Sequence, residues 1–147
     1  MQVIGSIKNK GDKFFFSVEQ DNFIYSTINN TYSFPKKEIF VHIDGVVTKL
    51  SSEIESKTKN FESLNEKIAY LYSINFSLES HICGSFNIYL FDYSSKKLKI
   101  IRDPRGTRSI FYTITEGDFI FSSDQDYLKK NLKSLTLNNK KLIEFLN

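Results

Sequence analysis

The chain has few of the residues that mark secreted, fibrous or membrane-spanning proteins. Its 147 residues include one cysteine, Cys83, so no disulfide can form within the chain. Six glycines and two prolines are too few for a collagen-like protein or a flexible linker. No apolar run approaches the roughly 20 residues that cross a bilayer as a helix. No basic segment followed by an apolar core opens the chain. We therefore expect a cytoplasmic protein without a membrane segment.

Charge and spacing exclude several other classes. The net charge is only +3, with lysines spread along the chain and gathered at 129–141, which indicates a solvated helix face. A nucleic-acid-binding protein would concentrate this charge beside a reader motif, and no such motif is present. His42 and His81 have no metal-ligand spacing, and no glycine-rich phosphate loop occurs, so we expect no metal and no cofactor in this chain.

Aromatic and β-forming residues are abundant. Hydrophobic residues make up 40% of the chain and aromatics 15%, with 14 Phe and 8 Tyr, which excludes a disordered tail. The length fits one domain with a single core. No internal repeat is present.

The first half predicts β-strands. Residues 2–7, 14–20 and 22–28 have the composition of strands, with a turn at 10–12 and a loop at 29–37. Residues 38–50 predict a hairpin, because Asp44 and Gly45 lie between β-branched runs and Asp-Gly suits a type I′ turn.

The second half predicts more regular elements. A polar loop at 51–59 precedes a helix at 60–75, with Asn60 as its N-cap and a single apolar stripe. Ser123 and Asp126 resemble a capping pair for a helix of about ten residues. Strands are expected at 84–93, 98–103, 108–115 and 118–123, and a last helical piece at 140–147. This order predicts an α+β fold with two antiparallel sheets and helices packed outside them.

A motif lies between two of these strands. The stretch IIRDPRGTRSIFYT, residues 100–113, contains all three arginines of the chain, Arg102, Arg105 and Arg108. It is part of a series that begins with Gly84, Phe86 and Asp92. The series continues with Arg102, Asp103, Gly106, Arg108, Phe111 and Tyr112, and ends with Phe121, Ser122, Ser123 and Asp124.

In order and spacing over about 45 residues, this series resembles the end of the glutaminase domain of the asparagine synthetase family, a class II glutamine amidotransferase domain. The first half of the chain is similar only in outline. The resemblance implies an N-terminal-nucleophile (Ntn) hydrolase fold, a shortened αββα sandwich. It also implies a degenerate glutaminase-like domain at 1–135, and the start of a linker or helix to a missing or separate synthetase domain at 136–147. The outline is closest to β-lactam synthetases and lasso-peptide cyclases.

The resemblance implies a nucleophile that this chain does not carry. The family attacks glutamine with a free N-terminal cysteine, whose own amine can act as base. Gln2 occupies the matching position, and a glutamine amide is no nucleophile. Cys83 is internal, and we expect it to be a small buried residue.

The family's substrate-binding positions also differ. Its Asn-Gly oxyanion pair corresponds to Asp44-Gly45, where a carboxylate would repel the oxyanion, and a plain turn is the favoured interpretation. No arginine precedes Arg102 to hold the glutamine carboxylate, and Lys36 or Lys37 could attract it only without a bidentate fork. The family also binds the α-amine of glutamine with an aspartate. The matching stretch here is Asn60-Phe61-Glu62, which lacks the aspartate, and Glu62 is the nearest acidic residue.

The arginine motif is expected to be structural. Arg102 and Asp103 would hold the turn by pairing with each other or with nearby carbonyls, and Gly106 would supply its backbone freedom. Arg105 and Arg108 could face a partner or solvent. Of the three phenylalanines at 14–16, Phe15 points to the opposite face from its neighbours and could form a contact surface.

These observations lead to three hypotheses. The first is a non-catalytic scaffold domain of an ATP-dependent amide-forming enzyme that activates a peptide carboxylate. The family's ATP-binding loop is absent here, so the partner would be a synthetase domain or subunit that carries it. The second is a free-standing peptide- or protein-binding module on the same fold, using exposed strand edges. The third, an amidohydrolase, would require processing that exposes a new Ser or Thr.

Overall fold

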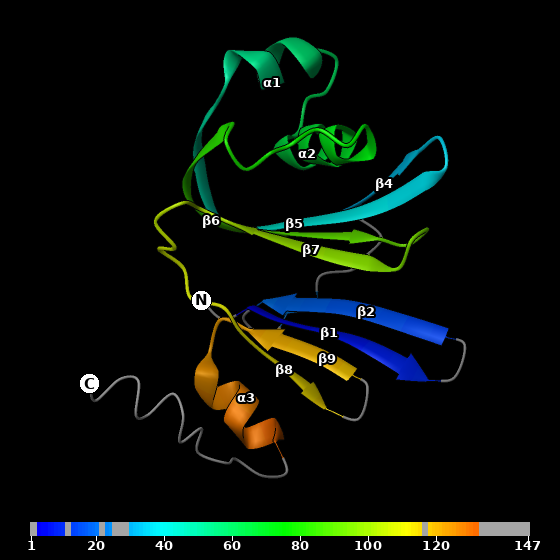
Figure 1. The fold of residues 1–147 in the computed structure, drawn as a ribbon, viewed down its shortest axis with the longest axis vertical. Coiled ribbons are helices and arrows are strands. Elements are labelled where there is room, and N and C mark those ends of the chain that lie inside the picture. The colour runs from blue at the N-terminus through cyan, green and yellow to red at the C-terminus, as the bar shows by residue number, and fades with distance from the viewer. Residues whose placement is uncertain (1–2, 11–12, 21–22, 25–29, 116–117, 133–147) are drawn as a thin grey trace, which may run out of the picture.

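The fold consists of two antiparallel β-sheets stacked between helices. The computed structural model describes residues 3–10, 13–20, 23–24, 30–115 and 118–132. In Figure 1, α1 and α2 cover the outer face of a four-stranded sheet, a five-stranded sheet lies beneath it, and α3 covers the outer face of that second sheet. The layering confirms the α+β class and the small Ntn-like αββα sandwich that the sequence predicts.

The five-stranded sheet joins the two ends of the described chain. Its strand order is β3-β2-β1-β9-β8. The strands are β1 (Val3–Lys10), β2 (Lys13–Gln20), β3 (Phe23–Ile24), β8 (Phe111–Thr115) and β9 (Asp118–Ser122). At the junction of β1 and β9, Gly5 lies opposite Phe121, and the ring of Phe121 occupies the space that a Cβ on Gly5 would need.

The four-stranded sheet is built from the middle of the chain and carries two helices. Its order is β4-β5-β6-β7. The strands are β4 (Thr31–Phe34), β5 (Lys37–Leu50), β6 (Ile82–Asp92) and β7 (Lys97–Arg102). The helices of the described residues are α1 (Ser52–Lys57) and α2 (Leu64–Ser73), between β5 and β6, and α3 (Gln125–Asn131), after β9.

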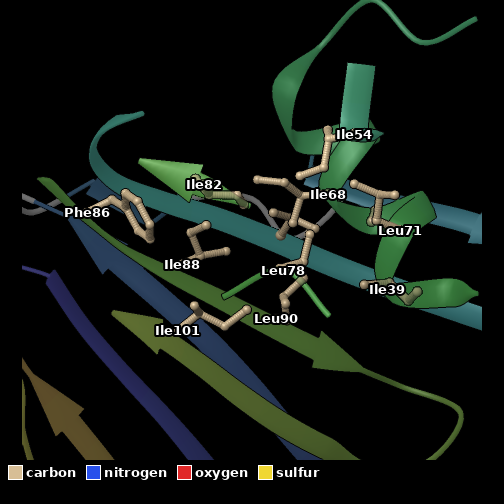
Figure 2. Close-up of a cluster of buried hydrophobic side chains, with 12 residues drawn as sticks. Ile39, Ile54, Ile68, Leu71, Leu78, Ile82, Phe86, Ile88, Leu90 and Ile101 are labelled. Atoms are coloured by element: carbon tan, nitrogen blue, oxygen red, sulfur yellow. The ribbon is translucent and has the colours of Figure 1, made fainter. Parts of the chain in front are cut away.

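Two apolar layers lie on opposite faces of β5 and β6. Side chains alternate along a strand, so every second residue faces the helices. The buried residues of that outer layer are aliphatic except for Phe86, and Ile88 and Leu90 of β6 pack in it with Ile68 and Leu71 of α2 (Figure 2). The layer between the two sheets is aromatic and contains buried Phe40, Tyr89, Phe91 and Phe121.

The structure corrects the predicted hairpin at 38–50. β5 runs without a turn from Lys37 to Leu50, and Asp44 and Gly45 lie in its middle, opposite Asn87 and Phe86 of β6. Gly45 does have a positive φ of 115°, so the glycine meets a backbone need, although the need is not that of a turn.

Several boundaries also differ from the expectations. The predicted loop at 29–37 contains β4, and the predicted loop at 51–59 contains α1, capped by Ser51. α2 begins at Leu64 with Ser63 as N-cap rather than Asn60, and Asp124 rather than Ser123 caps α3. Gln2, the turn around 11–12, most of the strand expected at 22–28 and the helix at 140–147 lie outside the described residues. No helix in the described part of the chain is long and apolar enough to cross a membrane.

Candidate functional site

The arginine motif forms a tight loop at one end of the sandwich, between β7 and β8. Asp103 organises it, because its carboxylate accepts hydrogen bonds from the backbone amides of Arg105 (3.0 Å) and Thr107 (3.1 Å) and from the Thr107 hydroxyl (2.7 Å). The Thr107 hydroxyl, followed by the backbone amides, holds the pKa of the Asp103 carboxyl below its usual value. Asp103 is therefore an anionic acceptor at the centre of the loop.

Arg102 closes the same loop from the other side. Its Nη2 donates to the carbonyl oxygens of Gly106 (3.1 Å) and Arg108 (2.9 Å). Gly106 has a φ of 59°, which a residue with a side chain adopts less readily. Of the two expected roles for Arg102 and Asp103, bonding to loop groups is what the structure shows, and no ion pair between them is found in this described loop.

Arg108 leaves the loop and enters the space between the sheets. Its Nη1 donates to Oδ1 of Asp44 at 2.8 Å, across 64 residues of sequence. Asp44 is almost fully buried, with a side chain 1% exposed, and that of Arg108 is 31% exposed. Arg108 therefore has the structural role expected of the motif, through Asp44 rather than through a partner surface, and Asp44 is one half of a buried ion pair rather than a turn residue.

Gly45 makes room for this ion pair. A Cβ built on Gly45 would lie 2.5 Å from Nε of Arg108 and 2.2 Å from the carbonyl oxygen of Ser85. The guanidinium therefore lies directly over the glycine backbone. Asp44 therefore supplies the negative charge that pairs with Arg108, and Gly45, which has no side chain, leaves space for the guanidinium group.

Further polar groups are buried beside the pair, on the same inter-sheet face. Asn87 lies opposite Asp44 across β5 and β6, and Tyr89 lies opposite His42. Within the described structure, both amide atoms of Asn87, the Tyr89 hydroxyl, Oδ2 of Asp44 and Nε of Arg108 are buried without a hydrogen-bond partner. Groups of this kind bind ordered water or a ligand, because leaving them unsatisfied is costly.

Burial changes the titration of this cluster. It lowers the pKa of His42, and the nearby Asp44 carboxylate only partly offsets the change. It also raises the pKa of Tyr89, an effect that Asp44 reinforces. Both rings are therefore held neutral, since a low dielectric disfavours their charged forms.

The other positions implied by the resemblance do not join this cluster. Glu62 is exposed ahead of α2, which packs on the outer face of the four-stranded sheet, whereas Asp44 faces inward. The ammonium of Lys37 donates to the Ser73 carbonyl (2.9 Å) and to the Asn75 side chain (3.2 Å) at the end of α2. Arg105 is exposed on the loop, and the side chain of Phe15 lies outside the described part of the structure.

Cys83 is exposed rather than buried, contrary to the expectation from sequence. It lies in β6, four residues before Asn87, so it is about 13 Å along the strand from the ion pair. Its amine is part of a strand peptide bond and cannot serve as the base that an N-terminal nucleophile uses. Cys83 and Arg105 line a surface pocket of about 470 Å³.

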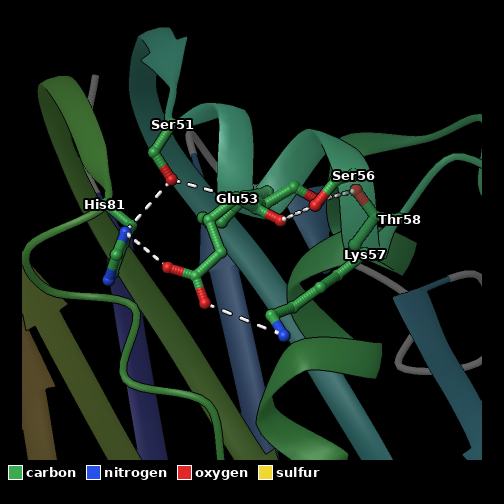
Figure 3. Close-up of polar contacts among 7 residues, drawn as sticks. Ser51, Glu53, Ser56, Lys57, Thr58 and His81 are labelled. Carbon is green, nitrogen blue, oxygen red and sulfur yellow. Dashed lines mark hydrogen bonds and ion pairs between the residues drawn. The ribbon is translucent and has the colours of Figure 1, made fainter.

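A second polar cluster surrounds His81 near the start of α1 (Figure 3). The Ser51 hydroxyl lies 3.1 Å from His81 Nδ1 and also accepts from the backbone amide of Ile54, while Glu53 lies 4.0 Å from the same Nδ1. A catalytic relay needs the nucleophile and the acid on opposite ring nitrogens. Because both face Nδ1, this cluster is a helix cap rather than a hydrolytic triad. The described residues contain no group of three or more His, Cys, Asp or Glu side chains suited to a metal ion.

The layering and the inward-facing polar cluster define a sandwich of the Ntn-hydrolase type. Residues 35–130 match a protein family described as a glutamine amidotransferase domain. The match covers more than half of the 147 residues, and the chain belongs to this family. No curated protein and no solved structure matches the chain significantly.

Proposed function

We propose that this amidotransferase domain does not hydrolyse glutamine and instead serves as a scaffold within an ATP-dependent amide-forming enzyme of the asparagine synthetase type. The observation that carries the proposal is the buried ion pair between Asp44 and Arg108. It occupies the position where the resemblance puts the oxyanion donors. Stabilising a developing oxyanion requires preorganised donors aimed into free space. Here a carboxylate stands in that place, and the guanidinium that neutralises it fills the room above Gly45.

The position of Cys83 also supports the absence of glutamine hydrolysis, because the reaction needs a nucleophilic thiol next to the oxyanion donors. Cys83, the only cysteine of the chain, lies near the start of β6. The residue opposite Asp44 is Asn87 and not Cys83. A thiol attacking a glutamine amide would have to be about 3–3.5 Å from the carbonyl carbon held by the oxyanion donors. The distance along the strand excludes such a geometry for Cys83 and Gly45 together.

The experiment that tests the loss of hydrolysis is covalent labelling followed by intact mass measurement. Iodoacetamide should add one adduct to the exposed Cys83, which shows that the thiol is reactive. An electrophilic glutamine analogue should add none, and glutamine should yield no glutamate or ammonia above the buffer rate. Ammonia release that Cys83→Ser abolishes would overturn the proposal. So would an adduct of the analogue at any residue.

The scaffold role requires a separate test. The tagged chain should be purified from its native host, and the proteins that accompany it should be identified by mass spectrometry. Recovery of a synthetase with an ATP-binding loop, or of this sequence within a longer chain that carries one, is the expected result. The substrate of such a machine would be a peptide carboxylate activated as an adenylate.

One observation favours a second candidate, a peptide- or protein-binding module on the same fold. Apolar side chains of β8, Tyr112 and Ile114, are 68% and 69% exposed. An apolar strand face that remains uncovered is typical of an interaction surface. If the native partner lacks an ATP-binding loop, this candidate replaces the first.

A further inference from the structure

On one side of the sandwich, the edge strand of the lower sheet is not covered by the edge strand of the upper sheet. β8 is the last strand of the five-stranded sheet, and β7 is the last strand of the four-stranded sheet. Both edges lie on the same side of the molecule (Figure 1), because residues of both strands line one cavity of about 450 Å³. Its walls are Ile7, Tyr112 and Phe119 from the lower sheet and Leu98, Ile100 and Arg102 from β7.

The exposed apolar residues of β8 belong to the inter-sheet face. Tyr112 lies opposite Phe121, and Ile114 lies opposite Phe119, and residues opposite each other on neighbouring strands share a face. Phe119 and Phe121 belong to the aromatic layer between the sheets. Tyr112 and Ile114 are nevertheless more than two thirds exposed, because no strand in the described part of the upper sheet covers them.

The register of β7 shows which backbone groups face this open side. The Asp103 amide donates to the Phe86 carbonyl at 3.0 Å, directly after the pair Arg102 and Asn87. Hydrogen-bonded positions alternate along an antiparallel strand. The odd-numbered residues of β7 therefore bond to β6, and the amides and carbonyls of Leu98, Ile100 and Arg102 point to the open edge.

The positive charge of the lysines on β7 favours some binding partners of this edge over others. Lys97 and Lys99 alternate with the apolar residues of β7, and Lys99 contacts Glu79 at 2.6 Å. Pairing β7 with β7 of a second copy would bring lysines together, which opposes self-association. A neighbouring strand with acidic residues at these positions would be stabilised instead.

We propose that the open edge of β7 accepts an extended segment of a partner protein as a fifth strand of the upper sheet. Its apolar residues lie over Tyr112 and Ile114, and its alternate acidic residues lie beside Lys97 and Lys99. Strands in a sheet are about 4.8 Å apart, so the added strand stands above β8, where the cover is missing. Backbone bonds to Leu98, Ile100 and Arg102 give the affinity, and the alternating pattern gives the specificity.

The first test uses an acetylated and amidated probe peptide, Glu-Val-Glu-Trp-Glu-Val-Glu. The protein contains no tryptophan, so emission near the tryptophan maximum reports the peptide alone. We expect a saturable blue shift with a dissociation constant of about 10–100 µM, weak because the free peptide must be ordered on binding. The same peptide with lysine in place of glutamate, or with N-methylated alternate amides, should not bind. Equal binding of either control would overturn the proposal.

The second test determines whether the peptide binds next to Ile114 of β8. Ile114→Asp should weaken binding by about tenfold, because one buried aliphatic contact is lost and like charge is added. Val46→Asp is the matched control, since Val46 is also an apolar strand residue, 61% exposed, but lies on β5. Unchanged binding by Ile114→Asp would overturn the proposal. So would a concentration-dependent dimer that Ile114→Asp abolishes, because the edge would then bind a second copy.

Discussion

Nη1 of Arg108 lies 2.8 Å from Oδ1 of Asp44 and joins the loop after β7 to the centre of β5. The pair connects the arginine loop in the second half of the chain to a strand in the first half.

Removal of one partner of the ion pair should be more costly than removal of both. Arg108→Met leaves the buried Asp44 carboxylate without its cation and should lower the free energy of unfolding by about 3 kcal/mol. Asp44→Leu together with Arg108→Met should recover part of that loss, because no unpaired charge remains. Urea unfolding followed by far-ultraviolet circular dichroism measures all the variants. Additive effects of the single changes would contradict a direct interaction.

Gly45 should tolerate substitution less well than Gly106. Gly45→Ala places a Cβ 2.2 Å from a backbone carbonyl at a φ of 115°, so a loss of more than about 2 kcal/mol is expected. At Gly106 the nearest atom to a new Cβ is Nη2 of Arg102 at 3.0 Å, which belongs to a side chain that can move. Gly106→Ala should therefore cost about 1 kcal/mol. Thermal unfolding of the two variants compares them, and a reversed order would contradict the geometry.

Asp103 should stabilise the motif loop through its hydrogen bonds. Asp103→Ala removes the acceptor for two backbone amides and the Thr107 hydroxyl, and should cost about 2 kcal/mol. Thr107→Val should cost less, because the backbone bonds remain. Since the folded pKa of Asp103 is lowered, its contribution is present above the usual carboxyl pKa and is lost as pH falls through the folded value. Equal losses for both variants would show that the carboxylate is not the centre of the loop.

His42 should make the fold sensitive to mild acid. Its folded pKa is lowered, so below about pH 6.5 the unfolded chain binds a proton that the folded chain does not. The free energy of unfolding should therefore fall as pH drops from 7.5 to 5, with a slope of at most about 1.4 kcal/mol per pH unit. His42→Phe should reduce this slope. The same slope in wild type and His42→Phe would assign the effect to other groups.

The local elements that sequence predicted well are those set by neighbouring residues. β7, β9 and the loop around Gly106 follow from alternating apolar residues and a glycine at a positive φ. The sequence does not predict α1, because a helix of six residues with one buried side chain, Ile54, gives no apolar stripe. Its N-cap, Ser51, followed by acidic residues, was the signal that could have located it.

The ion pair could not be predicted, because its cause is not local. Asp44-Gly45 between β-branched residues is a strong hairpin pattern, and the glycine does adopt a positive φ. What decides against a turn is the pairing of β5 with β6 along its length and an arginine 64 residues away. The exposure of Cys83 is likewise not evident from the sequence, because this residue lies at the start of a strand that is otherwise mostly apolar and buried.

The pairing of β1 with β9 determines when the lower sheet can form during synthesis. Ile4 lies opposite Ser122, so the lower sheet is incomplete until almost all of the described chain has been made. The upper sheet with α1 and α2 is contiguous in sequence between β4 and β7 and has its own aliphatic core. Contacts of long sequence separation are slow to form, because a large loop must be closed first. The upper half is therefore the template on which the two distant ends of the described chain assemble, and the edge of β1 that pairs with β9 stays unpaired until β9 has been made.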